Sequence, residues 1–316
     1  MNSLKFSVVI PCYNASKWIE KALTSLESQN YKPLDVIVVD DGSTDDSIEV
    51  VNNYKQRSSL DILVLSQKNA GPAVARNLGV SQSKGDYIAF LDADDHWDTD
   101  KIATDASYLA NSNYKILVSN VNLVDNAGVV IRSNNNDYSN DSSEVCEKLF
   151  LGKLSMMTPT LVIERELFKK LGGFSKKLRY KEDHLLILKA VDYSGGLGFY
   201  TACKTNVRIH EGSMRNNINY FRLLRGYLNF EREVVSFKPE LKKFKNIFRS
   251  FLYFSIAKSY SSSSKKRSVY WTIKSLRENP RNIKAIILLF LLPFGVDKNS
   301  LVKIKSMLRG GYVRKR

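Results

Sequence analysis

Residues 85–95 read GDYIAFLDADD, an apolar run that passes directly into a cluster of carboxylates. The run from Tyr87 to Leu91 is typical of a buried strand, and a turn that ends at Asp86 precedes it. In an extended segment residues i and i+2 point the same way, so Asp92 and Asp94 face one point, where two carboxylates repel each other unless a cation lies between them. Mg²⁺ and Mn²⁺ suit such an oxygen-rich site. An acidic turn that caps a helix is the alternative interpretation.

This segment belongs to a longer alternation of strands and helices. Short β-branched runs predict strands, and apolar residues at helical spacing predict helices between them. The expected strands are residues 6–10, 35–39, 62–65 and 87–91, and the expected helices are residues 15–28, 47–54 and 73–81. The alternation predicts an α/β fold with a mostly parallel, doubly wound sheet whose ligand lies at the carboxyl ends of the strands. Beyond residue 111 the pattern weakens, with an exposed loop expected at 132–143 and strands at 161–163 and 199–201.

Two other expected strands also end in polar residues. The first ends in PCYN at residues 11–14, and the second ends in DDGSTD at residues 40–45. A carboxylate pair beside Gly and Ser at a strand end can hydrogen-bond a base or a ribose, because glycine allows close approach of the backbone. Solvated acids at a helix cap are the alternative interpretation of this segment.

Composition and charge set the broad class of the chain. It has 316 residues, 43% of them hydrophobic, which is enough for one large core or for a domain with an appendage. The net charge of +16 is concentrated at one end, since residues 241–316 hold 19 Lys and Arg but only two acids, Glu278 and Asp297. Three widely spaced cysteines indicate free thiols in a reducing compartment. No secretory signal pattern opens the chain, and the apolar run 285–296 is too short and broken to span a bilayer, so we expect a cytoplasmic protein without a transmembrane helix.

Taken in order, these motifs resemble the family 2 glycosyltransferases of bacteria, in particular the non-processive type. The resemblance rests on SVVIPCYN at residues 7–14, VVDDGS at 38–43, NAGPAVARN at 69–77 and GDYIAFLDADD at 85–95. It extends through Trp97, Lys101, Gly172-Gly173-Phe174, Glu182-Asp183 and Arg208-Ile209-His210, and so covers about residues 5–215. It implies a catalytic domain of the GT-A fold over residues 1–216, followed by a helical, basic extension over residues 217–316.

The resemblance also implies a site for a nucleotide-diphosphate sugar, a UDP-sugar in particular. The residues that it assigns to the nucleoside pocket are Pro11, Tyr13, Asn14 and Asp41, with Arg76 near the diphosphate. Asp92, Ala93 and Asp94 match the family's Asp-x-Asp region, which handles the ribose and the metal. The implied metal is Mn²⁺ or Mg²⁺, with Asp94 as the first ligand, Asp92 and Asp95 beside it, and His210 completing the site through a ring nitrogen.

The resemblance assigns the catalytic base to Asp183, which Glu182 precedes. Such a base takes the proton from an acceptor hydroxyl as that oxygen attacks the anomeric carbon opposite the leaving diphosphate, which implies inversion. We expect the acidic neighbour to raise the pKa of Asp183. The implied acceptor is a saccharide or lipid-linked saccharide in cell-surface polysaccharide synthesis. Addition of a single sugar is favoured because the Gln-x-x-Arg-Trp motif and the long apolar spans of processive synthases are missing. His184 is an uncommon residue after the Glu-Asp pair, so the contacts with the acceptor stay open.

The basic extension favours an anionic membrane surface as a partner. Residues 284–292 are apolar enough to bury in a headgroup layer, and the cations that flank them can meet anionic lipid. These cations are Arg281, Lys298, Lys303, Lys305, Arg309, Arg314, Lys315 and Arg316. We therefore expect peripheral binding at the inner face of the cell membrane. A helical bundle with a solvated charged face is the alternative, and nucleic-acid binding is disfavoured because the aromatic residues form no stacking platform.

Two other functions fit parts of this pattern. A scaffold of the same fold would bind a nucleotide sugar or a membrane without turnover, but intact Asp92, Asp94, Asp183 and His210 argue against it. A nucleotidyltransferase has a similar nucleotide-binding sheet. The glycine-rich loop with Arg and Lys that such an enzyme would carry does not follow Ile10.

Overall fold

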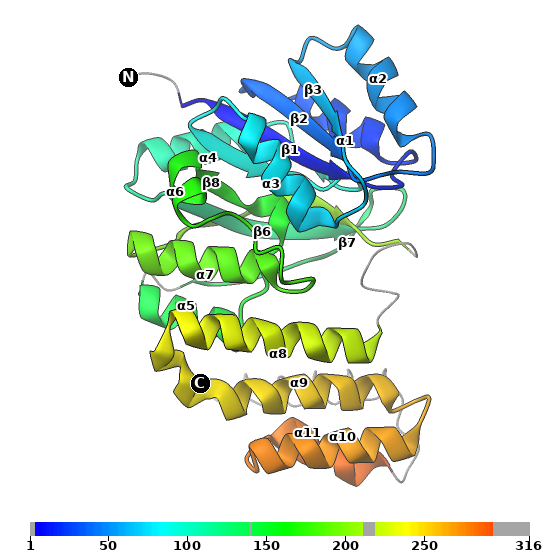
Figure 1. Cartoon of the computed structure of the whole chain (residues 1–316), viewed down its shortest axis with the longest axis vertical. Coiled ribbons are helices and arrows are strands. Elements are labelled where there is room, and N and C mark those ends of the chain that lie inside the picture. Colours follow the sequence, from blue (N-terminus) through cyan, green and yellow to red (C-terminus); the bar gives the residue numbers. More distant parts are fainter. Residues whose placement is uncertain (1–3, 139–140, 211–218, 293–316) are drawn as a thin grey trace, which may run out of the picture. The chain divides into compact units, whose positions relative to one another are not determined.

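The computed structural model of the chain describes residues 4–138, 141–210 and 219–292. Contacts between Cα atoms divide the chain into two units, Met1–Leu149 with Lys153–Ile218, and Phe150–Gly152 with Asn219–Arg316. The first unit is an α/β domain built on one sheet, and the second consists of helices (Figure 1). The boundary expected after residue 216 and the seven cations from Lys298 to Arg316 lie outside the described residues.

Four parallel strands form the first half of the sheet, as the sequence predicts. They are β1 Phe6–Cys12, β2 Asp35–Asp40, β3 Ile62–Ser66 and β4 Tyr87–Phe90, in the spatial order β3-β2-β1-β4. The helices α1 Ile19–Glu27, α2 Ser47–Arg57 and α3 Pro72–Gln82 connect them. Every residue of β2 is buried, which explains its apolar centre. Because the strands are parallel, their carboxyl ends share one edge of the sheet.

The sheet continues beyond β4 with strands of mixed direction. β8 Val162–Glu164 pairs antiparallel with β4 and with β6 Ile116–Val124, and β9 Gly198–Arg208 runs parallel to β6. Two shorter strands, β5 His96–Trp97 and β7 Val130–Ser133, pair antiparallel with β9 and β6 respectively. β8 and β9 occupy the strands expected near residues 161 and 199, whereas β6 lies in the segment where the sequence pattern is weak. The expected loop at 132–143 holds the end of β7 and the start of the next helix.

The remaining helices of this part of the chain are α4 Lys101–Ala110, α5 Ser142–Phe150, α6 Arg165–Lys170 and α7 Glu182–Ser194, with the short 3₁₀ helix η1 Thr158–Thr160. The turn before β4 requires glycine at position 85. A Cβ on Gly85 would lie 2.6 Å from the backbone N of Ser7. The Ser7 hydroxyl instead accepts from the backbone N of Gly85 at 2.7 Å, which holds β4 beside β1.

The second unit contains α8 Tyr220–Phe237, η2 Pro239–Phe244, α9 Lys245–Tyr260, α10 Lys265–Glu278 and α11 Ile283–Leu291. Ala257 of α9 packs with Leu288 and Leu292, and Trp271 lies against this cluster. A buried polar contact accompanies it, because Asn282 Nδ2 donates to the Ser250 hydroxyl at 3.0 Å. In the described part of the chain no helix is both long and apolar enough to cross a membrane.

Candidate active site

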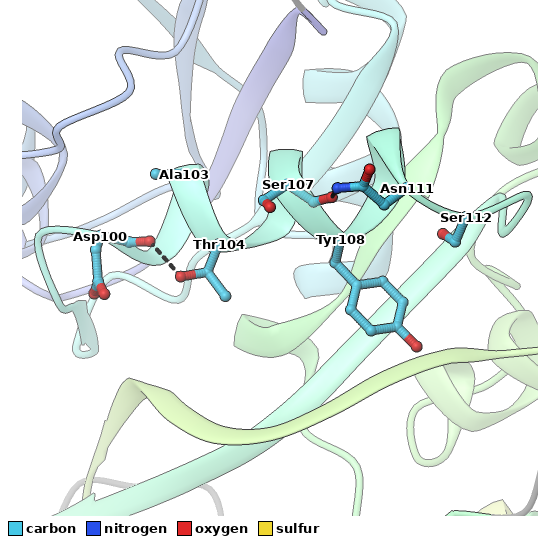
Figure 2. A pocket seen from close by; sticks show the side chains of 7 residues that line it. All are labelled: Asp100, Ala103, Thr104, Ser107, Tyr108, Asn111 and Ser112. Atoms are coloured by element: carbon cyan, nitrogen blue, oxygen red, sulfur yellow. Dashed lines mark hydrogen bonds between the residues drawn. The ribbon is translucent and has the colours of Figure 1, made fainter.

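A hollow of about 750 Å³ lies along one face of α4 (Figure 2). Its lining residues are Asp100, Ala103, Thr104, Ser107, Tyr108, Asn111 and Ser112. The carboxylate of Asp100 accepts from Lys204 Nζ at 2.6 Å. Its one carboxylate is this paired Asp100, and the lining holds neither a second carboxylate nor a histidine. Such groups lie instead at the carboxyl ends of β1, β2 and β4.

The residues after β1 form a strained turn that meets the residues after β2. Pro11 lies within β1 opposite Val39 of β2, and Asn14 has a φ of +50°. A non-glycine residue in this left-handed region is uncommon, and Asn is one of the residues that tolerate it. Asn14 Oδ1 accepts from the backbone N of Thr44 at 2.8 Å, which ties the two turns together. Tyr13 is 52% exposed, so its ring is available for a ligand to stack on.

Asp41 anchors the loop that leads into α3. The side chain is buried, and Oδ1 and Oδ2 accept from the backbone N atoms of Ala70 and Gly71 at 2.7 and 2.8 Å. Gln67 Nε2 also donates to Asp41 Oδ1, at 2.7 Å. The carboxylate therefore holds the loop from residue 67 to 71 at the edge where β1 and β2 end.

The three carboxylates that follow β4 have different partners. Asp92 Oδ1 accepts from Arg76 Nη2 at 2.6 Å. Asp94 Oδ2 lies 3.0 Å from His210 Nε2. Asp95 is buried, and its Oδ1 accepts from the last backbone N–H of β9 at 2.8 Å. Burial, and then the negative charge of Asp92, raise the pKa of Asp94, so these two acids lie close enough to interact although their nearest partners differ.

Asp94 and His210 provide a donor set that fits a divalent metal. Carboxylate oxygen suits Mg²⁺ and Mn²⁺, and the imidazole nitrogen is the commonest nitrogen ligand of metals. Within the residues that the structure describes, no three His, Cys, Asp or Glu side chains come together as a ligand set. Two protein ligands still fit these ions, because they complete their coordination with substrate phosphates and water. Asp92 and Asp95, which the sequence also predicts as ligands, have protein partners in this structure.

Trp18 and Arg208 support the position of His210. The ring centroids of Trp18 and His210 are 5.6 Å apart, and the Arg208 guanidinium lies 4.5 Å from the centroid of the Trp18 ring. Arg208 Nε donates to the carbonyl oxygen of Asp94 at 3.1 Å, so the same side chain holds the acidic loop. Neither role is predicted from the sequence: Trp18 has the spacing of one more apolar residue of a helix, and Arg208 is only a neighbour of His210 in its motif.

The Glu-Asp pair opens α7. Lys181 precedes it with a φ of +66°, and both acids lie in the first turn, where the helix dipole favours negative charge. Asp183 Oδ1 accepts from the backbone N of His184 at 2.7 Å and lies 2.9 Å from the Nδ1 atom of the same residue. Asp183 Oδ2 accepts from the Thr158 hydroxyl at 3.3 Å.

The two acids differ in charge state. Burial, together with the charge of Asp183, raises the pKa of Glu182 to about 7, although Arg76 opposes the shift. Burial alone would raise the pKa of Asp183 as well, but the hydrogen bonds from His184 and the charge of Lys181 hold it well below its usual range. The prediction of a raised pKa for Asp183 is therefore wrong. Hydrogen bonds keep Asp183 ionised, and Glu182 is the acid whose pKa is raised.

Arg76 connects the acidic loop after β4 with the start of α7. Its side chain is buried, with Nη2 bound to Asp92 and Nη1 3.5 Å from Glu182 Oε1. The guanidinium carbon lies 5.5 Å from the centroid of the Phe174 ring. Buried Nε and Nη1 have no hydrogen-bond partner among the described residues. The two groups of acids therefore lie on either side of one guanidinium.

Comparison with known proteins gives a family for the chain's first half. The model of glycosyl transferase family 2 matches residues 7–172. An uncharacterized glycosyltransferase of Haemophilus influenzae is 35% identical over 132 residues, which cover 42% of this chain and 53% of that protein. The amylovoran biosynthesis glycosyltransferase AmsB of Erwinia amylovora is 34% identical over 194 residues, 59% of this chain and 64% of that protein. The chain thus spans less than two thirds of either relative.

Solved structures share the fold. The crystal structure of S. aureus TarS 1-349 in complex with UDP-GlcNAc has a TM-score of 0.62 at 20% identity, and the match covers 98% of this chain and 92% of that one. The mannosyltransferase PcManGT from Pyrobaculum calidifontis in complex with GDP-Man and Mn²⁺ has a TM-score of 0.59 at 16% identity, covering 100% and 89%. These likenesses confirm the GT-A fold that the sequence predicts.

Proposed function

Because the chain belongs to glycosyl transferase family 2, we propose that its acids catalyse the transfer of one sugar from a nucleotide-diphosphate donor, a UDP-sugar in particular, with inversion. The observation that carries the proposal is the bridge by Arg76, which joins Asp92 after β4 to Glu182 at the start of α7. It brings the acid loop after β4 close to the Glu-Asp pair, whose second member Asp183 is the proposed base, and a displacement at a sugar carbon requires such proximity. The TarS complex with UDP-GlcNAc supports the choice of a UDP-sugar.

On the donor side, Pro11, Tyr13, Asn14 and Asp41 would line the nucleoside pocket, and Asp92 with buried Ala93 would lie beside the ribose. Arg76, which pairs with Asp92, would act on the diphosphate through its positive charge. Asp94 and His210 would hold Mn²⁺ or Mg²⁺, which supplies charge to stabilise the leaving diphosphate. The Mn²⁺ in the PcManGT complex supports a divalent metal.

On the acceptor side, Asp183 would act as the general base. Its ionised carboxylate takes the proton from the acceptor hydroxyl as that oxygen forms a bond to the anomeric carbon, and the bond to the diphosphate oxygen breaks with its electron pair. Attack from the face opposite the diphosphate inverts the configuration. Glu182 with its raised pKa keeps a proton for much of the time near pH 7, which limits repulsion beside the base. The acceptor is a saccharide or lipid-linked saccharide of a cell-surface polysaccharide, a choice that the name of AmsB supports.

A panel of UDP-sugars and GDP-sugars tests the proposed function. With Mn²⁺ present, we expect release of the nucleoside diphosphate from one donor at a rate above background, and faster release when an acceptor saccharide is added. Binding of a nucleotide sugar without release, across the whole panel, would contradict transfer and favour a scaffold that only binds the donor.

We also propose that the second unit binds the inner face of the cell membrane peripherally. On α11, Ile283 and Phe290 are 68% and 73% exposed on one face, while Ala285 and Leu288 of the opposite face are buried. Such an exposed apolar stripe suits the boundary between headgroups and acyl chains. The 19 cations of residues 241–316 complement anionic lipid, each contributing about 1 kcal/mol near a charged surface.

Vesicle flotation tests the membrane proposal. We expect the chain to float with anionic vesicles, to release as salt is raised, and to bind less when Ile283 and Phe290 are both changed to Ser. Phe221→Ser is the matched control, because Phe221 is 75% exposed on a different helix, α8. Equal binding to neutral vesicles, or an α11 double variant that floats like the wild type, would count against this surface.

A further inference from the structure

We infer that Lys181 and His184 form a positioning chain that holds the Asp183 carboxylate in one orientation for its work as a base. The inference rests on the proposed function, in which Asp183 accepts the acceptor's proton. Three contacts carry it: His184 N to Asp183 Oδ1 at 2.7 Å, His184 Nδ1 to the same oxygen at 2.9 Å, and Lys181 Nζ to His184 Nε2 at 2.9 Å.

The chain has a fixed direction. A lysine ammonium group donates hydrogen bonds and accepts none, so His184 Nε2 must accept from Lys181. The ring proton then sits on Nδ1, which donates to Asp183 Oδ1. Burial, and then the charge of Lys181, lower the pKa of His184, so the ring is the neutral tautomer that this pattern needs.

Burial keeps this arrangement apart from solvent and substrate. His184 is 5% exposed and both of its ring nitrogens are engaged, so the ring is poorly placed to contact an acceptor directly. Lys181 has a φ of +66°, a conformation that a non-glycine residue keeps only where its surroundings hold it. The contact from Nζ to His184 Nε2 is one such restraint, and it lies immediately before the two acids.

The consequence for Asp183 is a division between its two oxygens. Oδ1 accepts two hydrogen bonds from His184, whereas Oδ2 has the longer contact of 3.3 Å from the Thr158 hydroxyl. Oδ2 is therefore the oxygen that takes the acceptor's proton. The hydrogen bonds to Oδ1 make the carboxylate a somewhat weaker base, but they keep it ionised and fix its orientation. In a Ser-His-Asp triad the Asp orients the His, whereas here the His orients the Asp.

Two substitutions of His184 separate the hydrogen bond from the packing. His184→Leu fills similar space without a donor, and we expect kcat to fall about 10- to 100-fold, the effect of losing a hydrogen bond to a charged group, with the donor KM nearly unchanged. His184→Asn places an amide N–H near the position of Nδ1, and we expect it to recover most of kcat. Lys181→Met should cause a smaller loss in the same direction, because His184 keeps its contact with Asp183 but loses its fixed tautomer.

A ¹³C-carboxyl NMR titration of Asp183 in the full chain tests the contacts without any turnover. The charged groups that act on this carboxylate are Lys181, Glu182 and Arg76, and the titratable ring of His184 contacts it. Wild type and variants are therefore compared on a Glu182→Gln background, which removes the titration of the neighbouring acid. We expect the pKa of Asp183 to rise in His184→Leu and to return toward the parent value in His184→Asn.

An unchanged Asp183 pKa in His184→Leu would overturn the inference even if no donor were found. Equal loss of kcat in the Leu and Asn variants, with unchanged melting temperatures, would overturn it too. If His184→Leu fails to fold, His184→Asn and His184→Gln are compared instead, since the longer Gln amide reaches the Nε2 position, and equal activity of these two would contradict the assignment. If the wild-type chain turns over no donor but the Asp183 pKa rises in His184→Leu as expected, the proposed function is wrong and the contact between His184 and Asp183 is supported.

Discussion

Asp94→Ala is expected to lower turnover by at least about 10²-fold in the presence of Mn²⁺, because it removes the carboxylate that faces His210 at 3.0 Å. The charge that develops on the leaving diphosphate would then lack its electrostatic partner. His210→Ala should act in the same direction. The measurement is the rate of nucleoside diphosphate release from the donor that the panel identifies.

Asp61→Ala is the matched control for Asp94→Ala. Asp61 is an exposed carboxylate that pairs with Lys84 at 3.0 Å on the surface, and we expect its loss to leave turnover near the wild-type value. Removal of the metal by EDTA should reproduce the defect of Asp94→Ala in the wild type. Turnover that persists undiminished in EDTA would rule out the metal role of Asp94 and His210.

The first two strands of the parallel half, β1 and β2, could be predicted because they are buried on both faces and their centres are unbroken apolar runs. β6 could not be predicted, although it is longer than β1 and β2. Its buried Ser119 and Asn120, and half-buried Asn122, break the apolar pattern. Their polar groups find partners only in the folded chain, as when Asn122 Nδ2 donates to Asn206 Oδ1 at 3.1 Å.

The acids after β4 could be located from the sequence, but their partners could not. The rule that residues i and i+2 face one point assumes an extended backbone. β4 ends at Phe90, and the backbone N of Asp95 donates to the carbonyl oxygen of Asp92 at 3.0 Å, so the acids lie in a turn. Asp92 consequently meets Arg76, which the resemblance had placed near the diphosphate.

The ionisation of the Glu-Asp pair was also beyond sequence reasoning. Two adjacent carboxylates are expected to repel each other, but which of them keeps its proton depends on the other residues that contact them. His184 binds one of them and Arg76 contacts the other, and neither contact has a sequence signature. Trp18 illustrates the same limit, since its helical spacing conceals its contact with His210.

Asp183→Asn should lower kcat by about 10² to 10⁴, because Asp183 is the proposed base. Asn keeps the shape of the side chain, and its Oδ1 can still accept from His184, but the amide cannot take a proton from the acceptor. We therefore expect the donor KM and the melting temperature to stay near the wild-type values. Glu182→Gln should cost less, because its amide resembles the protonated acid.

The most direct test is kcat of Asp183→Asn at saturating donor and metal, recorded with a melting curve and beside Glu182→Gln. We expect a fall of at least about 10² in kcat for Asp183→Asn without loss of folding, and a smaller effect for Glu182→Gln. A greater loss in Glu182→Gln would move the base to Glu182. Near-normal kcat in both variants would contradict a base at the start of α7, because neither acid would then take part in the reaction.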